Sequence, residues 1–304
     1  MAAIHSIDHF ALAVPDLNLA RTFFSTFGLE VQENTAAEGG LNVLAADGHR
    51  WARVVQGERK HLDYLSFNAY QEDIFPLHSQ VTEAGATNVS VVSQGDEVSF
   101  WFRDPDGNRI QVRAGPKTTL DEKPTRMSES TPADKRGACM RSQAVTVRPS
   151  RLSHVLLFTP DVLASVAFYE RALGLRLSDK SRDIIAFMHA PHGCDHHLVA
   201  FAKSSARGWH HSSWDVPDVN AVGAGAAQMA AAGYTKGWGT GRHVLGSNYF
   251  HYVEDPWGSF CEYSADIDYV SADKPWLAGD FPPEDSLYLW GPSVPENFIF
   301  NTEA

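Results

Sequence analysis

One internal duplication constrains this chain more than any other feature. Residues 6 to 31, SIDHFALAVPDLNLARTFFSTFGLEV, return in altered form as residues 151 to 177, RLSHVLLFTPDVLASVAFYERALGLRL. In each copy a histidine, His9 or His154, precedes a Pro-Asp pair, two adjacent aromatic residues and a Gly-Leu pair. Each copy therefore predicts a strand, then an amphipathic helix that begins near the Pro-Asp pair and ends at glycine, then further strands.

Weaker echoes of the same pattern occur inside each half. Residues 61 to 86 and residues 209 to 234 both read as strand, loop and helix, and the segment 101 to 112 parallels the segment 252 to 263. Four similar units are thus arranged as two pairs, which predicts an α+β protein. Small units that each expose an apolar sheet face must pair with a neighbour to bury that face.

The chain of 304 residues is long enough for two domains that each bury a core. We expect a first domain over residues 1 to 115, a linker or long excursion over 116 to 148, and a second domain over 149 to 304. The segment 116 to 148 is rich in Pro, Ser, Thr and charge with little apolar periodicity. Residues 265 to 304 are too apolar for a free tail, so they should pack on their own domain or across a subunit interface.

The charge and hydropathy of the chain limit the kinds of partner that it can bind. A formal net charge of −12 argues against nucleic acid, because a surface that binds phosphates normally carries a basic excess. The amino terminus lacks the cationic and apolar regions of an export signal, and no apolar run approaches membrane-spanning length. We therefore expect a cytoplasmic protein with a small-molecule partner and no membrane contact. Three scattered cysteines are too few for a disulfide framework or a zinc knuckle.

Comparison of the two halves reveals a set of candidate metal ligands. Equivalent places of the repeat carry His9, Tyr64 and Gln111 in the first half, and His154, His211 and Glu262 in the second. Two neutral imidazoles and one carboxylate suit a divalent first-row metal that keeps open coordination positions. The first set lacks the carboxylate and the second imidazole, so we expect it to be structural and without metal.

Two pairs of adjacent histidines require a choice between neighbours. Alternation along a strand lets only one of His210 and His211 face the interior, and the match with Tyr64 selects His211. His210 is then predicted to be an outward neighbour. By the same alternation His197 should lie on one strand face with Val199, and an ordinary strand histidine is the alternative interpretation of His197.

Glu262 lies in a predicted hairpin. Residues 248 to 254 and 259 to 264 should form two strands joined by a turn at Asp255 to Gly258. An unpaired buried carboxylate costs several kcal/mol, so Glu262 among apolar neighbours calls for a cation. From this segment alone, an orientation toward the surface is the alternative.

These residues carry a resemblance to a known family. The chain resembles the two-domain type I extradiol ring-cleavage dioxygenases of the vicinal oxygen chelate superfamily. The signature of that family is read here as Gly241-Arg242-His243, Tyr252, Asp255-Pro256-Trp257-Gly258 and Glu262. The resemblance spans residues 4 to 265 and implies four βαβββ modules paired into two glyoxalase-like domains.

The resemblance also implies roles for the site residues. It makes His154, His211 and Glu262 ligands of Fe(II), with Mn(II) as an alternative metal. It further implies that His197 is an acid/base catalyst and that His243 and Tyr252 contact the substrate. The segment VLGSN after His243 offers no acidic side chain to orient that ring.

The implied activity is the insertion of both atoms of O2 into a catechol, which opens the ring beside the diol and gives a muconic semialdehyde. A homo-oligomer that serves the catabolism of aromatic compounds is expected. Two alternatives come from the same superfamily. One is a glyoxalase-like lyase or isomerase that uses its metal only as a Lewis acid, and the other is a non-enzymatic protein that sequesters a ligand.

Overall fold

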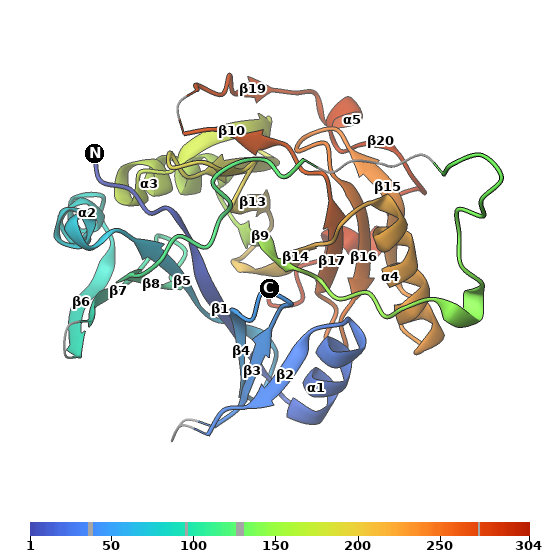
Figure 1. Ribbon diagram of the computed structural model, residues 1–304. Coiled ribbons are helices and arrows are strands. Elements are labelled where there is room, and N and C mark those ends of the chain that lie inside the picture. The colour runs from blue at the N-terminus through green and yellow to red at the C-terminus, as the bar shows by residue number, and fades with distance from the viewer. Residues whose placement is uncertain (36–38, 95–96, 126–130, 273) are drawn as a thin grey trace.

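The computed structural model describes the whole chain except residues 36–38, 95–96, 126–130 and 273. Two large sheets, one from each half of the sequence, dominate the fold (Figure 1). Helices α1 to α4 lie against these sheets, and the last forty residues run along the second sheet.

The first sheet has the strand order β2-β3-β4-β1-β5-β8-β7-β6. Its strands are β1 (Ser6–Val14), β2 (Glu30–Glu33), β3 (Leu41–Leu44), β4 (Arg50–Gln56), β5 (His61–Ala69), β6 (Thr87–Gln94), β7 (Glu97–Arg103) and β8 (Arg109–Ala114). Helix α1 (Leu17–Thr26) follows β1, and a 3₁₀ turn (Gln71–Asp73) and helix α2 (Ile74–Glu83) follow β5. Two strand-helix units therefore join side by side through β1 and β5, which pair antiparallel.

The second sheet repeats this order as β10-β11-β13-β9-β14-β17-β16-β15. Its strands are β9 (Arg151–Thr159), β10 (Arg176–Ser181), β11 (Ile185–His189), β13 (Val199–Lys203), β14 (Gly208–Asp215), β15 (Gly237–His243), β16 (Tyr249–Glu254) and β17 (Phe260–Ala265). Helix α3 (Val162–Leu173) follows β9, and helix α4 (Val219–Ala231) follows β14. The duplication seen in the sequence is thus a duplication of sheet topology.

Sequence chemistry explains where the helices begin and end. The carboxylates of Asp16 and Asp161 accept hydrogen bonds from backbone N–H groups of the first turns of α1 and α3, and Asp218 does the same for α4. Gly174 ends α3 with φ of 67°, a left-handed conformation that glycine adopts without steric cost. The predicted Pro-Asp starts and glycine stops are confirmed at these positions.

The tail from residue 266 adds strands to the second sheet, which is the first of the two arrangements expected from the sequence. Its elements are β18 (Tyr269–Val270), β19 (Gly279–Asp280), α5 (Pro283–Ser286), β20 (Tyr288–Trp290) and a 3₁₀ helix (Glu296–Ile299). Strand β19 extends one edge of the second sheet beside β10, and β20 extends the other edge beside β15. Strand β18 pairs with the short β12 (Cys194–Asp195). The tail therefore borders the second sheet on both sides.

The two halves share one hydrophobic core. The ring of Phe27 stacks on that of Tyr263 at 3.9 Å, and the Tyr263 hydroxyl donates to the Phe27 carbonyl oxygen. The rings of Phe10 and Trp209 lie 4.6 Å apart. Thr119, which lies between the two halves in the sequence, contacts both, because its hydroxyl lies 3.5 Å from the carbonyl oxygen of His5 and 3.2 Å from that of Gly193. Residues of the first half therefore pack against the second sheet and stabilise its position.

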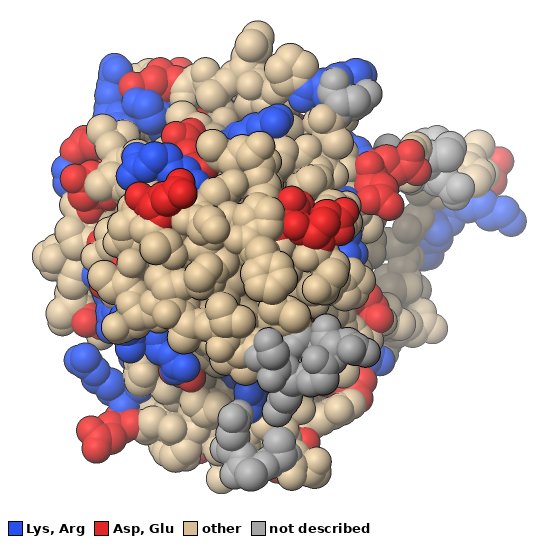
Figure 2. Space-filling model, turned by 90° about the vertical axis from the view of Figure 1, so that its left-hand side faces the viewer, with Lys and Arg blue, Asp and Glu red and all other residues tan. Residues whose placement is uncertain are grey.

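The surface gives no sign of a polyanion-binding face on the side shown in Figure 2. Basic and acidic side chains there are dispersed among uncharged residues. Within the described part of the chain, no helix has the length and apolar character needed to cross a membrane.

Candidate active site

Three adjacent strands of the second sheet bring His154, His211 and Glu262 together. They are β9, β14 and β17, which are neighbours in the sheet order. Ser213 pairs with His154 on one side and with Glu262 on the other. His211 lies two residues before Ser213 and therefore projects from the same face of β14.

These three buried side chains form a compact donor cluster. One donor atom from each lies within 4.8 Å of the other two. The Glu262 Oε2 atom is 3.3 Å from His154 Nε2 and 3.6 Å from His211 Nε2. The His211 Nε2 and Glu262 Oε2 atoms are buried without a hydrogen-bond partner among the described residues. Orphaned buried polar atoms are costly, and a cation between them would satisfy both, so the cluster fits a divalent metal.

The charge state of Glu262 suits such an ion. Although burial raises its pKa, the neighbouring imidazoles of His154 and His243 hold the pKa of this carboxyl below its ordinary value. Asn248, which is also buried, donates from Nδ2 to Glu262 Oε1 at 2.9 Å. Because Asn248 binds Oε1, the other carboxylate oxygen, Oε2, faces the His154 and His211 rings. Asn248 was not predicted from the sequence, where it was only part of VLGSN.

The prediction that His210 faces outward is wrong. It is buried and lines the site cavity instead of facing outward. The pairing of β14 with β9 shifts register between Trp209 and His211, so simple alternation fails at this point. The Nδ1 atoms of His210 and His211 are 2.6 Å apart, and His210 Nε2 is 2.7 Å from the carbonyl oxygen of Phe298. Because a carbonyl only accepts, the Nε2 atom of His210 carries the hydrogen of that neutral ring, and its Nδ1 atom accepts. The Nδ1 atom of His211 must then donate to it, which leaves a lone pair on the Nε2 atom of His211.

The prediction that His197 shares a strand face with Val199 is also wrong. It lies between β12 and β13, outside any strand, so its position does not come from strand alternation with Val199. Its ring centroid is 4.0 Å from that of His154, and it lines the same cavity. Burial, followed by the neighbouring imidazoles, lowers the pKa of His197 well below its ordinary value. The ring is therefore neutral at pH 7.

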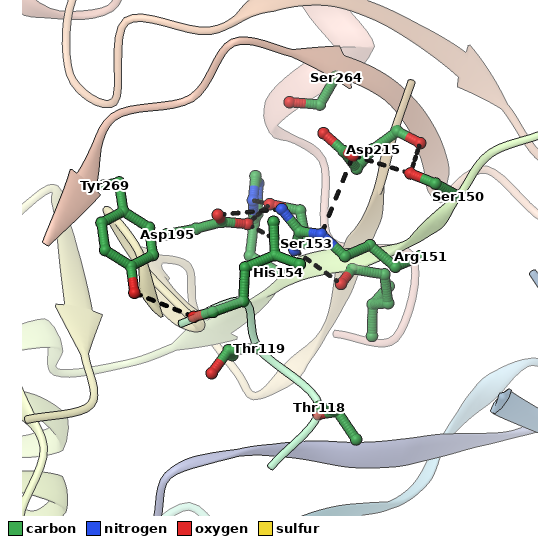
Figure 3. A network of polar contacts seen from close by, with 12 residues as sticks. Thr118, Thr119, Ser150, Arg151, Ser153, His154, Asp195, Asp215, Ser264 and Tyr269 are labelled. Atoms are coloured by element: carbon green, nitrogen blue, oxygen red, sulfur yellow. Dashed lines mark hydrogen bonds and ion pairs between the residues drawn. The ribbon is translucent and has the colours of Figure 1, made fainter. Parts of the chain in front are cut away.

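A buried polar network holds His154 (Figure 3). The Ser153 Oγ atom lies 3.2 Å from His154 Nδ1 and donates to Asp195 Oδ2 at 2.7 Å. Arg151 donates from two guanidinium nitrogens to the two oxygens of Asp195 at 2.8 and 3.0 Å. Because the Ser153 hydrogen goes to Asp195, its oxygen can accept from His154 Nδ1–H, which leaves Nε2 free as a ligand.

His243 and Tyr252 lie beside the donor cluster on β15 and β16. The His243 Nε2 atom is 3.0 Å from the Tyr252 hydroxyl and 3.9 Å from Glu262 Oε1. The His243 Nδ1 atom is 2.7 Å from the carbonyl oxygen of Leu287 in the tail. Burial, then the charge of Glu262, raises the pKa of Tyr252 well above its usual range, so its hydroxyl keeps its proton. The missing acidic partner of His243 is thus replaced by a backbone carbonyl.

The cluster opens into one cavity of about 330 Å³. Five of the six predicted site residues line it, all but Glu262. The other walls are mainly apolar and include Leu156, Phe158, Ile185, Phe187, Leu245 and Phe298. The tail supplies Pro283, Ser286, Leu287 and Ile299 to the same walls. No tryptophan is among these described lining residues. Trp209 and Trp238 are buried in the core instead.

The equivalent place in the first sheet is occupied differently. There the His9 Nδ1 atom lies 2.6 Å from Asp8 Oδ2, and its Nε2 atom lies 2.8 Å from the Tyr64 hydroxyl. Gln111 accepts a hydrogen bond from the Ser66 hydroxyl. Both ring nitrogens of His9 are engaged by protein groups, in contrast to the orphaned His211 Nε2.

Comparison with known proteins identifies the class of fold. Residues 151–263 match the model of the Glyoxalase/Bleomycin resistance protein/Dioxygenase superfamily. The structure superposes on the Mn(II)-bound glyoxalase from Novosphingobium aromaticivorans with a TM-score of 0.77 at 24% identity, covering 98% of this chain and 94% of that one. It superposes on homoprotocatechuate 2,3-dioxygenase from Arthrobacter globiformis with a TM-score of 0.77 at 20% identity, covering 99% and 92%. The fold is that of the superfamily.

Sequence identity narrows the class further. The chain is 60% identical over 302 residues to Metapyrocatechase 2 of Cupriavidus necator, covering 99% of this chain and 93% of that protein. It belongs to the metapyrocatechase family of extradiol ring-cleaving dioxygenases. The resemblance, the α+β glyoxalase fold and the dioxygenase function predicted from the sequence are therefore confirmed.

Proposed function

We propose that the protein is an Fe(II)-dependent extradiol dioxygenase that opens an uncharged monocyclic catechol beside its diol. His154, His211 and Glu262 would hold the metal, and Mn(II) is the alternative ion. The observation that carries this proposal is the buried cluster in which His211 Nε2 and Glu262 Oε2 have no hydrogen-bond partner within the described part of the chain. Bound Fe(II) would polarise two adjacent hydroxyl groups and would supply the redox centre that lets dioxygen react with a catechol.

His197 would move the proton. A neutral imidazole at the cavity wall can take a proton from one substrate hydroxyl and return it later, and such acid/base steps contribute about 10²- to 10⁴-fold in rate. The electron pair of the broken O–H bond stays on the substrate oxygen. The burial and low pKa of His197 support a ring that is uncharged before substrate binds.

Tyr252 and His243 would orient the substrate. With His243 Nδ1–H donated to Leu287, the neutral ring accepts at Nε2 from the Tyr252 hydroxyl. The oxygen of Tyr252 then retains lone pairs that can accept a hydrogen bond from a substrate hydroxyl. This directional chain would select a diol held at the metal.

Cavity shape and charge support the substrate class. A volume of about 330 Å³ lies at the low end of the roughly 300 to 1,000 Å³ of small-molecule sites. Lys203 is the one Lys, Arg, Asp or Glu among the described lining residues, and it pairs with Asp183. A carboxylated catechol would therefore lack a dedicated cationic partner, and a biaryl diol would fill the cavity more tightly than a single ring.

The test is a substrate panel under defined metal loading. Protein reconstituted anaerobically with Fe(II) is mixed with oxygenated buffer and catechol, methylcatechols, 2,3-dihydroxybiphenyl or a carboxylated catechol. Yellow semialdehyde should form with the highest kcat/KM for the monocyclic uncharged diols. Colourless dicarboxylate product would contradict cleavage beside the diol, and preference for the biaryl or the acid would contradict the substrate class. Reconstitution with Mn(II) or Zn(II) decides the metal, because zinc fills the same ligands without redox chemistry.

The proposal also includes a cytoplasmic location and a homo-oligomer, as the sequence predicts. Light scattering after size-exclusion chromatography measures the assembly, and cell fractionation measures the location. A monomer at working concentration would contradict the proposed homo-oligomer.

A further inference from the structure

His196 is buried next to the proposed acid/base residue and has partners on both ring nitrogens. Its Nε2 atom lies 2.8 Å from Asp179 Oδ2, and its Nδ1 atom lies 3.1 Å from His197 Nδ1. His196 is 0% exposed and Asp179 is 5% exposed, so water does not compete for these contacts. The three side chains form a continuous line from a buried carboxylate to the cavity.

The donor and acceptor roles of these groups fix which atom donates in each hydrogen bond from Asp179 through His196 to His197. An ionised carboxylate only accepts, so the Nε2 atom of His196 carries hydrogen. A neutral imidazole carries hydrogen on one nitrogen, so Nδ1 of His196 accepts and Nδ1 of His197 donates. The second nitrogen of His197 then holds a lone pair, and His197 lines the cavity.

Asp179 is itself held in place. Its Oδ1 atom accepts from the backbone N–H of Gly279 at 2.7 Å, which ties it to strand β19 of the tail. The rings of Phe187 and Trp276 pack against His196 with centroids 5.8 and 5.2 Å away. The carboxylate therefore has one oxygen fixed by the backbone and the other reserved for His196.

We propose that Asp179 and His196 are positioning residues that keep the Nε2 lone pair of His197 directed at the substrate. This inference rests on the acid/base role proposed for His197. When a substrate hydroxyl gives its proton to that nitrogen, the O–H electron pair remains on oxygen, and the linked imidazoles carry a positive charge that the Asp179 carboxylate stabilises. A carboxylate that orients an imidazole through Nδ1 does the same for serine hydrolases.

Asp179→Asn tests the direction of the line with little change of shape. The Gly279 N–H should keep the amide oxygen where Oδ1 was, so the amide nitrogen would face His196 and donate to its Nε2. His196 must then carry hydrogen on Nδ1, and His197 must carry its own on Nε2, where it can no longer accept. We expect kcat to fall by about 10²-fold or more with KM and iron content unchanged. The control is Asp280→Asn, which lies beside Gly279 on strand β19 and forms a partly exposed pair with Lys180, so it should retain wild-type kcat.

A cycle with His197→Asn separates positioning from general damage. His197→Asn alone should retain iron and lose about 10²-fold in kcat, and adding Asp179→Asn to it should cost nothing further. Equal losses from Asp179→Asn in both backgrounds would overturn the proposal, as would full activity of the single variant. Full activity of His197→Asn would instead overturn the acid/base role itself.

A second pair of variants covers misfolding of Asp179→Asn. His196→Gln can donate to Asp179 from its amide nitrogen and accept from His197 through its oxygen, so it should keep most of the wild-type kcat. His196→Leu can do neither and should fall to the level of His197→Asn with iron retained. Equal kcat in the two His196 variants would contradict the proposal.

Discussion

The carbonyl oxygen of Leu287 lies 2.7 Å from Nδ1 of His243. A residue of the tail thereby decides which nitrogen of an active-site imidazole carries hydrogen, because a carbonyl only accepts. The tail does this again through the Phe298 carbonyl, which accepts from His210. Residues after the last strand of the duplicated unit are therefore part of the site, although the repeat itself ends before them.

Phe298→Ala should loosen this part of the tail. The ring is buried among Trp238, Phe250, Tyr252 and Phe260, and such a truncation costs about 3 to 5 kcal/mol. We expect a lower urea midpoint and lower kcat, since the Phe298 carbonyl would no longer be held against His210. Phe300→Ala is the matched control, because that ring is 59% exposed and its loss should change stability by about 0.5 kcal/mol or less. Equal midpoints for the two variants would mean that the tail is not anchored by Phe298.

Glu262→Gln should abolish metal retention and turnover. The substitution keeps the shape of the side chain but removes the charge that offsets a dication between two neutral imidazoles. The measurement is metal content by atomic absorption after desalting. A variant with full iron and full activity would show that the three residues are not the ligands.

The first half offers the control for that experiment. His9→Ala should leave iron content unchanged, because both nitrogens of His9 are engaged by Asp8 and Tyr64. Loss of iron from this variant would mean that the first half also binds metal.

The duplication made much of this fold predictable, because repeated spacing in the sequence becomes repeated strand order in the sheets. The donor cluster was predictable for the same reason, since His154, His211 and Glu262 occupy equivalent places of the repeat. The position of His210 was not, because a register shift in β14 leaves no mark in the residue types. The tail carbonyls were not, because every residue has one. The contact of Asp179 with His196 joins β10 to a distant loop and depends on packing.

Acid should destabilise the protein partly through His251, a half-buried histidine. Burial lowers the pKa of His251 to about 4, below the roughly 6.5 of an unfolded chain. The unfolded state therefore binds more protons between these values, so the stability present above pH 6.5 is lost as pH falls toward 4. Between pH 7.5 and 5.5, wild type should lose about 1 kcal/mol more than His251→Gln in urea unfolding. Identical losses would show that His251 does not contribute.

Ser153→Ala should weaken metal binding without removing a ligand. The Ser153 oxygen accepts from His154 Nδ1, while its hydrogen goes to Asp195, which Arg151 holds with two hydrogen bonds (Figure 3). Without that oxygen the His154 ring can rotate or place its hydrogen on Nε2, where it would block the ligand lone pair. Loss of such an orienting partner typically costs 10- to 100-fold in metal affinity, so we expect a rise of about that size in the dissociation constant for Zn(II) or Mn(II), measured by competition with a chromophoric chelator.

Ser153→Thr keeps the hydroxyl and provides the matched control. Its affinity should stay within about threefold of wild type, because the same oxygen can accept from His154 and the same hydrogen can go to Asp195. A threonine methyl group must also fit beside buried His154, so thermal unfolding of both variants is measured to separate packing from orientation. If alanine and threonine bind metal equally well, packing alone holds the His154 ring. If alanine binds weakly at unchanged thermal stability while threonine binds as wild type does, the Ser153 oxygen orients the ligand.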